Sequence, residues 1–426
     1  MSAHPNPGPV PAAGPAAGGK PLAIALAGLL SLAVTMGIGR FAFTPLLPMM
    51  LHDGVIDLPG ASWLATANYL GYWLGAMACA LQPWAWQRLG IAAPPVHTVA
   101  VKIGLVATVA LTFGMASAYA ALWPLWRFAA GVASALVFVY VSGWCLARLT
   151  ALGAPALAGV IYVGPGLGIA VSGLAASAMV AGGWTAATGW AAFGGLAIVL
   201  SALAWPQLRG RVAPPAATAA GGTATPGAGA TALFTLGYGL AGFGYIVTAT
   251  FLPVIARQAL PGSVWLDLFW PLFGAAVGIG ALVTVRLPVV WDRRHLLTGC
   301  YAMQALGVLL TVWWPSLAGF AFGSLLLGLP FTAITLFAMQ EARRLKPHNA
   351  SAFIGGLTAA YGLGQIAGPP MVALLLRHSA TPGQGFALSL EIAAAALLVG
   401  GVVFAGLARR HPLGSSLRPS QRPQSR

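Results

Sequence analysis

An arginine lies inside the first long apolar run of the chain. Residues 21–39 carry no charge and are long enough to cross a bilayer as a helix, and Arg40 follows them with apolar residues on both sides. A guanidinium in hydrocarbon costs about 3 kcal/mol or more, so it needs a partner or an aqueous cavity. In a cavity it could hold a carboxylate or phosphate through two parallel hydrogen bonds. Arg40 is therefore the first candidate for substrate binding, and an ion pair with Asp53 or Asp57 is the alternative.

Amides and phenols in other apolar runs could bind the same ligand. Asn68 and Tyr72 are four residues apart, as are Tyr361 and Gln365, so each pair lies on one helix face. Tyr245 occupies the position equivalent to Arg40 in a repeat described below. These residues complete the predicted substrate site, although each could instead hold helices together.

Charged groups that could couple transport to an ion are few. Arg127 is one candidate, with snorkelling to the surface as the alternative, and Asp267 is the second-half acid expected on a cavity-lining helix. Glu391 lies deep in the last apolar run, where a structural or interface role is favoured. No histidine falls in an expected hydrocarbon core, which makes a histidine relay improbable. The sequence also lacks metal-ligand spacing, a catalytic triad and a phosphate-binding loop, so we expect no cofactor, metal or catalytic residue.

The composition places these residues in a membrane. Charged residues make up 6% and hydrophobic residues 58% of the 426-residue chain, whereas about a quarter charged is ordinary in soluble proteins. Twelve apolar segments are expected as helices. They lie near 21–50, 61–83, 98–118, 121–147, 153–181, 184–206, 231–256, 264–288, 296–315, 316–340, 350–376 and 383–408.

The basic residues predict how the chain is oriented. With the N-terminus in the cytoplasm, all but four of the 21 lysines and arginines fall in cytoplasmic loops, tails or helix ends. The exceptions are Arg40, Arg127, Arg257 and Arg377. We therefore expect a multi-pass protein of the bacterial inner (cytoplasmic) membrane with both termini cytoplasmic. The net charge of +15 is a topology signal, and no nucleic-acid partner is expected.

The second half of the chain repeats the first. Three positions of the first apolar run recur at one constant offset, which also maps Arg40 onto Tyr245. The recurring pairs are Gly37 and Gly242, Gly39 and Gly244, and Pro48 and Pro253. The predicted divisions are a disordered cytoplasmic N-terminus (1–20), a six-helix bundle (21–206), a flexible cytoplasmic linker (207–230), a second six-helix bundle (231–408) and a basic cytoplasmic tail (409–426).

Two stretches then resemble a known family. Gly39-Arg40-Phe41-Ala42-Phe43-Thr44-Pro45-Leu46-Leu47-Pro48 and Asn68-Tyr69-Leu70-Gly71-Tyr72 are similar to the bacterial YbfB/YjiJ-type branch of the major facilitator superfamily. The resemblance implies an all-α integral membrane fold of twelve transmembrane helices in two pseudo-symmetric six-helix bundles. It also implies secondary transport by alternating access.

Shorter motifs of the superfamily are also present. Gly164-Pro165-Gly166-Leu167-Gly168 resembles the helix-5 motif associated with antiporters, and Arg127 with Gly131 resembles the helix-4 Arg-x-x-x-Gly motif. Asp292-Arg293-Arg294 matches the loop motif between helices 8 and 9, whereas its first-half counterpart, Gln87-Arg88-Leu89-Gly90, lacks the acid. The resemblance implies a coupling role for Arg127. It implies a conformational role for Gly164, Pro165, Gly168, Asp292 and Arg293.

The predicted function is a secondary active transporter for a small organic solute. Arg40 and Arg127 have no deep acid in their half to neutralise them, which favours an anion that bears a carboxylate. The helix-5 motif favours proton-coupled antiport and efflux. The main alternative is a multidrug-type exporter of neutral or cationic compounds, with the arginines bound to Asp53, Asp57 or backbone carbonyls. A transporter-like sensor would need a signalling domain, and a membrane-embedded enzyme would need a catalytic cluster. The expected partners are the solute, protons and the lipid bilayer, and a monomer is expected.

Overall fold

The structure is a computed structural model in which every regular element of the described residues is a helix. The described residues are 20–90, 97–210, 227–263, 265–288, 290–346 and 350–410. The predicted disordered N-terminus, linker and basic tail lie largely outside these ranges.

The first membrane span is broken into three segments. An α-helix, α1 (Pro21–Leu32), continues into a π-helical segment, η1 (Ala33–Arg40), and the chain resumes as α2 (Phe43–His52). In η1 the backbone N–H of Phe41 donates to the carbonyl of Met36, five residues back, at 3.1 Å. Such wide turns are rare in proteins, and many of those that are known lie at functional sites. Arg40 is the last residue of the π-helical segment.

The remaining spans are mostly single long helices. In the first half they are α3 (Leu58–Arg88), α4 (His97–Met115), α5 (Trp123–Ala151), α6 (Val163–Ala181) with the preceding η3 (Pro155–Tyr162), and α7 (Ala186–Ala204). In the second half they are α8 (Ala228–Ala259), α9 (Phe269–Thr284), α10 (Arg293–Trp313), α11 (Leu317–Gly328) followed by α12 (Phe331–Leu345), α13 (Ala350–His378) and α14 (Pro382–Arg410). Short 3-10 turns are η2 (Ala120–Leu122), η4 (Trp205–Gln207) and η5 (Leu266–Leu268).

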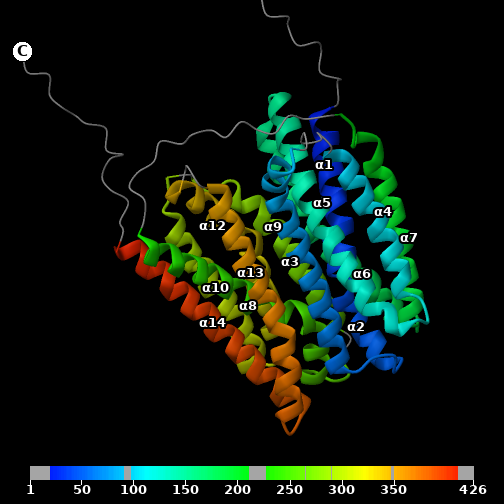
Figure 1. Ribbon diagram of the computed structural model, residues 1–426. Helices are drawn as coiled ribbons and strands as arrows, with labels where there is room; N and C mark the ends of the chain where they lie inside the picture. The colour runs from blue at the N-terminus through cyan, green and yellow to red at the C-terminus, as the bar shows by residue number, and fades with distance from the viewer. Residues whose placement is uncertain are drawn as a thin grey trace, which may run out of the picture.

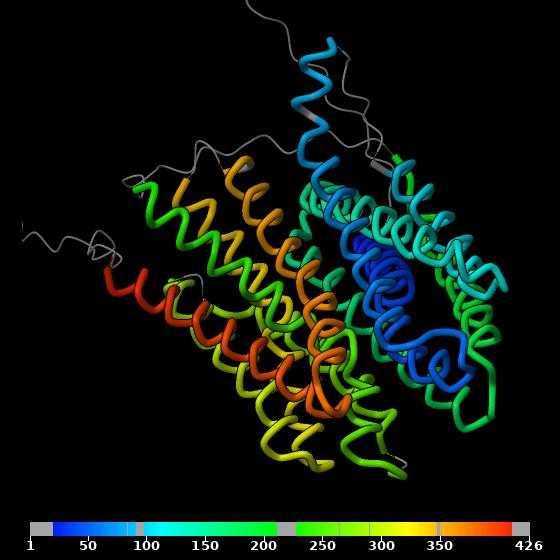
Figure 2. The backbone as a smooth tube through the Cα atoms, turned by 60° about the horizontal axis from the view of Figure 1, so that its bottom comes forward, coloured from blue at the N-terminus to red at the C-terminus, as the bar shows by residue number. Residues whose placement is uncertain are grey.

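These elements give the predicted twelve spans. Eleven helical segments of the described chain are long and apolar enough to cross a membrane. The twelfth is α3, whose 31 residues exceed the roughly 20 that a span needs. Figures 1 and 2 show α1–α7 gathered on one side and α8–α14 on the other. The all-α fold of two six-helix bundles is confirmed.

Contacts at the centre follow the predicted repeat. The hydroxyl of Thr44 in α2 donates to the carbonyl of Ala249 in α8 at 2.8 Å. Ala249 is the residue onto which the repeat offset maps Thr44, so equivalent positions of the two halves touch each other. Such a pair must lie at the pseudo-two-fold axis. Arg40, one turn earlier in the first span, therefore lies close to the boundary between the halves.

Glycines let α6 pack closely between the two halves. A Cβ atom on Gly37 would lie 2.4 Å from the Cα atom of Gly168, and one on Gly166 would lie 2.4 Å from the backbone nitrogen of Gly278 in α9. Only residues without side chains permit such approaches between membrane helices. One side of α6 thus contacts the π-helical segment, and another contacts the second half.

Candidate substrate site

The side chain of Arg40 points into a buried cluster of aromatic and amide groups. It is 3% exposed, and its Nη2 donates to Oε1 of Gln365 in α13 at 2.9 Å. The guanidinium carbon lies 4.0 Å from the ring centroid of Tyr72 and 5.2 Å from that of Tyr69, both in α3. A desolvated cation gains about 2 kcal/mol from an aromatic face. The Phe41 ring lies 5.4 Å away as well, so three faces and one amide surround the charge, and all are neutral.

A chain of side chains extends from Arg40 into the second half. Gln365 Nε2 donates to the hydroxyl of Tyr245 in α8, and the Tyr245 ring stacks on Tyr361 with centroids 6.0 Å apart. The next aromatic contact is between Tyr361 and Tyr238, at 4.9 Å. Five of the six predicted substrate residues thus form one cluster. Tyr245, which the repeat makes equivalent to Arg40, reaches Arg40 through Gln365.

The carboxylates are engaged elsewhere. Asp53 accepts from the backbone N–H of Ala186 at 2.6 Å, and Asp57 caps α3 by accepting from Gly60 N at 2.7 Å. Among the described residues, which include all six acids of the chain, neither Arg40 nor Arg127 forms an ion pair. The alternative pairing of Arg40 with Asp53 or Asp57 is therefore not present.

Arg127 in α5 holds the break in the first span. Its Nη1 donates to the carbonyl of Gly39 at 3.0 Å and its Nη2 to the carbonyl of Arg40 at 3.1 Å. In a regular helix the N–H of Thr44 would donate to the carbonyl of Arg40, but here it donates to the carbonyl of Phe41, and the next residue, Pro45, has no N–H. The π-helical segment thus leaves carbonyls that need a donor in hydrocarbon. Arg127 is 2% exposed and does not snorkel to the surface.

Asn68 lies beside Arg127 and not in the aromatic cluster around Arg40. Its Nδ2 donates to the carbonyl of Arg127 at 2.9 Å, which ties α3 to α5. Its Oδ1 is buried without a hydrogen-bond partner. Asn68 therefore positions the helices that carry Tyr72 and Arg127. Tyr69, which was not among the predicted substrate residues, contacts Arg40 and bonds the Thr250 hydroxyl in α8 at 2.8 Å.

Close packing of α3 on α5 depends on glycines in both helices, and Gly131 is the one in α5 that faces Asn68 and Tyr72. A Cβ atom on Gly131 would lie 2.1 Å from Asn68 O and 2.7 Å from Tyr72 N, and backbone atoms cannot turn aside. Gly131→Ala should therefore destabilise the protein by about 1–3 kcal/mol and weaken ligand binding, because it displaces Tyr72. Gly143→Ala in the same helix is the matched control, since its Cβ would meet nothing within 4 Å. Thermal unfolding in detergent measures both, and equal melting temperatures would contradict this packing.

Asp267 is remote from the arginines of the first half. It forms an ion pair with Arg257 at the end of the bundle opposite the termini, and both side chains are about a quarter exposed. The backbone carbonyl of Asp267 also accepts from Ser177 in α6 at 3.1 Å, which joins the two halves there. Glu391 in turn is exposed on α14, on the outside of the bundle.

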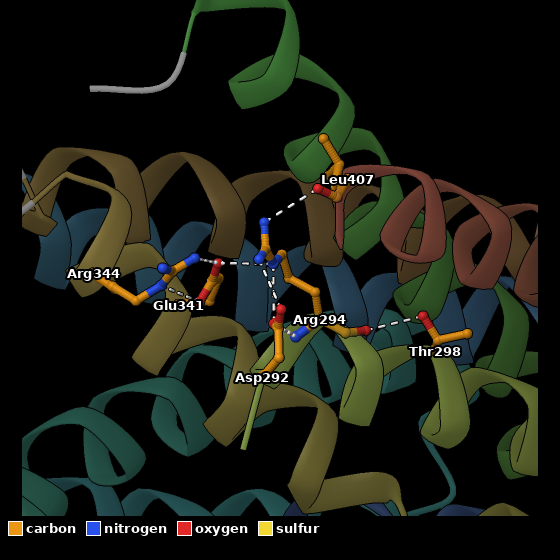
Figure 3. A network of polar contacts seen from close by, with 6 residues as sticks. All are labelled: Asp292, Arg294, Thr298, Glu341, Arg344 and Leu407. Carbon is orange, nitrogen blue, oxygen red and sulfur yellow. Dashed lines mark hydrogen bonds and ion pairs between the residues drawn. The ribbon is translucent and has the colours of Figure 1, made fainter. Parts of the chain in front are cut away.

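The predicted loop motif of the second half forms a charge network with a different arginine (Figure 3). Asp292 caps α10 and pairs with Arg294, whose Nη2 lies 2.7 Å from Oδ2. Burial raises the pKa of Asp292, but hydrogen bonds from Arg294 outweigh it and hold that pKa below its usual value. Arg294 also donates to Leu407 O at 3.1 Å and approaches the buried Glu341 at 3.6 Å.

This charge network ties three helices of one half together. Glu341 in α12 accepts two hydrogen bonds from Arg344, at 2.6 and 2.8 Å, and Arg294 reaches the last turn of α14 (Figure 3). Arg293, the predicted member, packs over the Phe337 ring at 5.3 Å. The contacts of this network therefore stay within the second half.

The helix-5 motif lies where α6 meets the first span. A Cβ atom on Gly164 would lie 2.3 Å from Leu29 O, and one on Gly168 would lie 2.6 Å from Ala33 O. Pro165 is buried between them. The motif thus packs against α1 and against the π-helical segment that ends at Arg40.

Comparison with known proteins places this arrangement in a family. A family model described as "Uncharacterised MFS-type transporter YbfB" matches residues 32–405. The chain belongs to this family. It is a multi-pass membrane protein with the family and fold of membrane transporters, and a secondary transporter by class. No curated protein matched it.

Solved structures confirm the fold of this MFS-type transporter. A nucleoside transporter, NupG, has a TM-score of 0.69 at 15% identity, covering 91% of this chain and 99% of its own. A D-xylose–proton symporter has a TM-score of 0.66 at 14% identity, covering 90% and 96%. A bacterial homologue of the human lysosomal transporter Spinster, in an inward-facing and unoccupied conformation, has a TM-score of 0.61 at 14% identity, covering 92% and 98%.

Proposed function

We propose that this transporter binds a small organic anion at Arg40 and exports it across the bacterial inner membrane in exchange for protons. The observation that carries the proposal is a buried guanidinium whose hydrogen-bond and ring partners are all neutral. A carboxylate would supply the missing charge and accept two parallel hydrogen bonds. The tyrosine rings beside Arg40 would pack against the apolar part of such a ligand. An aromatic or branched carboxylate fits this chemistry.

The position of the site supports alternating access. Arg40 belongs to the first half, and Gln365 and Tyr245 belong to the second, so a ligand there touches both. Hydrogen bonds of Thr44, Tyr69 and Ser177 join the halves between the site and the end opposite the termini. With cytoplasmic termini, as the basic residues favour, that end is periplasmic. We propose that 21–206 and 231–408 move as two units of a monomer and that Arg127 and Asp267 act in coupling. The helix-5 motif and the loop motif around Asp292 would then act in the conformational change.

A second candidate is an exporter of neutral or cationic compounds. One observation favours it: Arg127 is already bound to backbone carbonyls, as that alternative requires. Arg40 distinguishes the two, because its partners are one amide oxygen and aromatic faces. A cationic ligand beside an uncompensated guanidinium would be repelled. The anion is therefore the better supported substrate.

Transport by everted membrane vesicles tests the proposal. Hippurate is a suitable probe because it joins a carboxylate to an aromatic ring through a polar amide, which slows passive diffusion. Vesicles with an acidified lumen should accumulate hippurate and lose part of their pH gradient when it is added. Vesicles without the protein give the background. Accumulation that persists unchanged after nigericin collapses the pH gradient would exclude proton exchange.

A further inference from the structure

Gln365 occupies the place that an anion would need at Arg40. Its Oε1 accepts from Arg40 Nη2 at 2.9 Å, while its Nε2 donates to the Tyr245 hydroxyl. The orientation of the amide follows from chemistry, because a guanidinium has only donors and must face the amide oxygen. Gln365 and Arg40 are 2% and 3% exposed, so water does not compete for this contact.

We propose that Gln365 is an internal stand-in for the substrate carboxylate, which displaces the amide oxygen from Arg40 when it binds. This inference rests on the proposed function, in which Arg40 holds an anion. Binding then breaks the hydrogen bond between Arg40 and Gln365 and forms charge-assisted bonds between Arg40 and the ligand. Gln365 becomes a residue that sets specificity, since a ligand must bind Arg40 better than an amide does.

The energetic order of the two acceptors supports this exchange. The bond from Arg40 to the amide oxygen already has one ionised partner, and a carboxylate adds a second charge and a second acceptor oxygen. The amide satisfies one donor of Arg40 but leaves its charge uncompensated, and Nε of Arg40 remains without a partner. A carboxylate can accept from two guanidinium nitrogens and neutralise the charge. A neutral amide ligand offers nothing that Gln365 does not already provide, so it should be rejected.

The exchange also changes how the halves are joined. Gln365 and Tyr245 both belong to the second half, so their hydrogen bond can remain when Arg40 is released. The bond that breaks is the one between η1 and α13, which crosses from one half to the other. Substrate binding thus replaces a direct contact between the halves by one that passes through the ligand. An empty transporter keeps its central guanidinium occupied.

Gln365→Leu removes the competing acceptor at similar volume. It should bind hippurate about tenfold more tightly than the unaltered protein, because the ligand no longer has to displace a hydrogen bond to a charged group. Isothermal titration of the purified full-length protein gives the dissociation constant, and the melting temperature reports folding. Gln304→Leu is the matched control. Gln304 in α10 is equally buried and its Nε2 donates to Leu327 O in α11 at 3.2 Å, so its replacement should leave the affinity unchanged.

Gln365→Glu tests the same idea in the opposite direction. A carboxylate at this position would pair with Arg40 permanently, so hippurate binding should fall at least about tenfold while the protein stays folded. Weaker binding by Gln365→Leu would overturn the inference, because it would make Gln365 a direct ligand. Unchanged binding by Gln365→Glu would overturn it as well.

Arg40→Gln separates this inference from the proposed function. If Arg40→Gln binds hippurate as well as the unaltered protein does, the anion site itself is wrong. If Arg40→Gln loses hippurate and Gln365→Leu also binds it less well, the anion site stands and the stand-in role is wrong. Absence of binding in every variant contradicts both.

Discussion

Replacing Arg40 with glutamine is expected to weaken hippurate binding about a hundredfold. The guanidinium is the cation at the centre of the cluster, and truncating one partner of a buried charged pair costs roughly 2–5 kcal/mol. Glutamine keeps much of the length and can still donate to Gln365, so the fold should survive. Titration calorimetry on the purified protein measures the affinity, and thermal unfolding checks the fold. Arg40→Lys should lose less, since it keeps the charge but not the planar fork.

An arginine far from the cluster provides the control. Arg377 lies in the last turn of the same helix as Gln365 and is exposed. Arg377→Gln should leave hippurate affinity within a factor of about two, because an exposed charge at that distance is screened. Equal affinity for hippurate in Arg40→Gln and the unaltered protein would mean that Arg40 is structural. The neutral amide of hippurate should bind weakly to all three.

Replacing Arg127 with leucine is expected to destabilise the protein by about 2–5 kcal/mol. The carbonyls of Gly39 and Arg40 would each lose a charged donor, and an unsatisfied buried group costs about 1–3 kcal/mol. The guanidinium groups of Arg127 and Arg40 also repel each other, so the substitution removes that repulsion and offsets part of the loss. The melting temperature in detergent measures the sum. Arg127→Lys keeps one donor group and should fall between.

The same substitution should also weaken hippurate binding. Arg127 anchors the backbone carbonyl of Arg40, so its loss lets the end of the π-helical segment shift. Arg88→Gln, whose side chain stacks on Trp84 at the end of α3, should change neither stability nor affinity. If Arg127→Leu keeps its melting temperature but abolishes proton exchange, Arg127 acts in coupling alone. Its hydrogen bonds to the carbonyls of Gly39 and Arg40 then do not stabilise the fold.

The sequence predicted the fold well because composition and repeat constrain it strongly. Long apolar segments of this kind must form helices in the bilayer, where the backbone polar groups have no water to bond. The offset that links Gly37 to Gly242 also indicates which residues of the two halves are equivalent and can meet at the pseudo-two-fold axis. The contact between Thr44 and Ala249 follows from that offset. The sequence left Arg40 open between an interior site and an ion pair with Asp53 or Asp57, and in the structure it lies in the interior.

The roles of individual side chains were less predictable. The sequence left Arg127 open between a coupling role and snorkelling to the surface. Its backbone targets exist only because η1 is π-helical, and no pattern in the sequence predicts that wide turn. Pro45 is the one local signal, since it removes an N–H at the break. That Gln365 already holds the guanidinium of Arg40 could not be predicted, because a sequence shows residue types and not their contacts. The pairing of Asp292 with Arg294 instead of Arg293 depends on the direction of each side chain from the start of α10.

Counterflow in proteoliposomes tests the central claim most directly. Vesicles that contain the purified protein are loaded with unlabelled hippurate, and the uptake of labelled hippurate or of its labelled neutral amide is followed from outside. We predict transient accumulation of hippurate but not of the amide, and neither with Arg40→Gln. Equal exchange of the amide and hippurate, undiminished in Arg40→Gln, would contradict an anion site at Arg40.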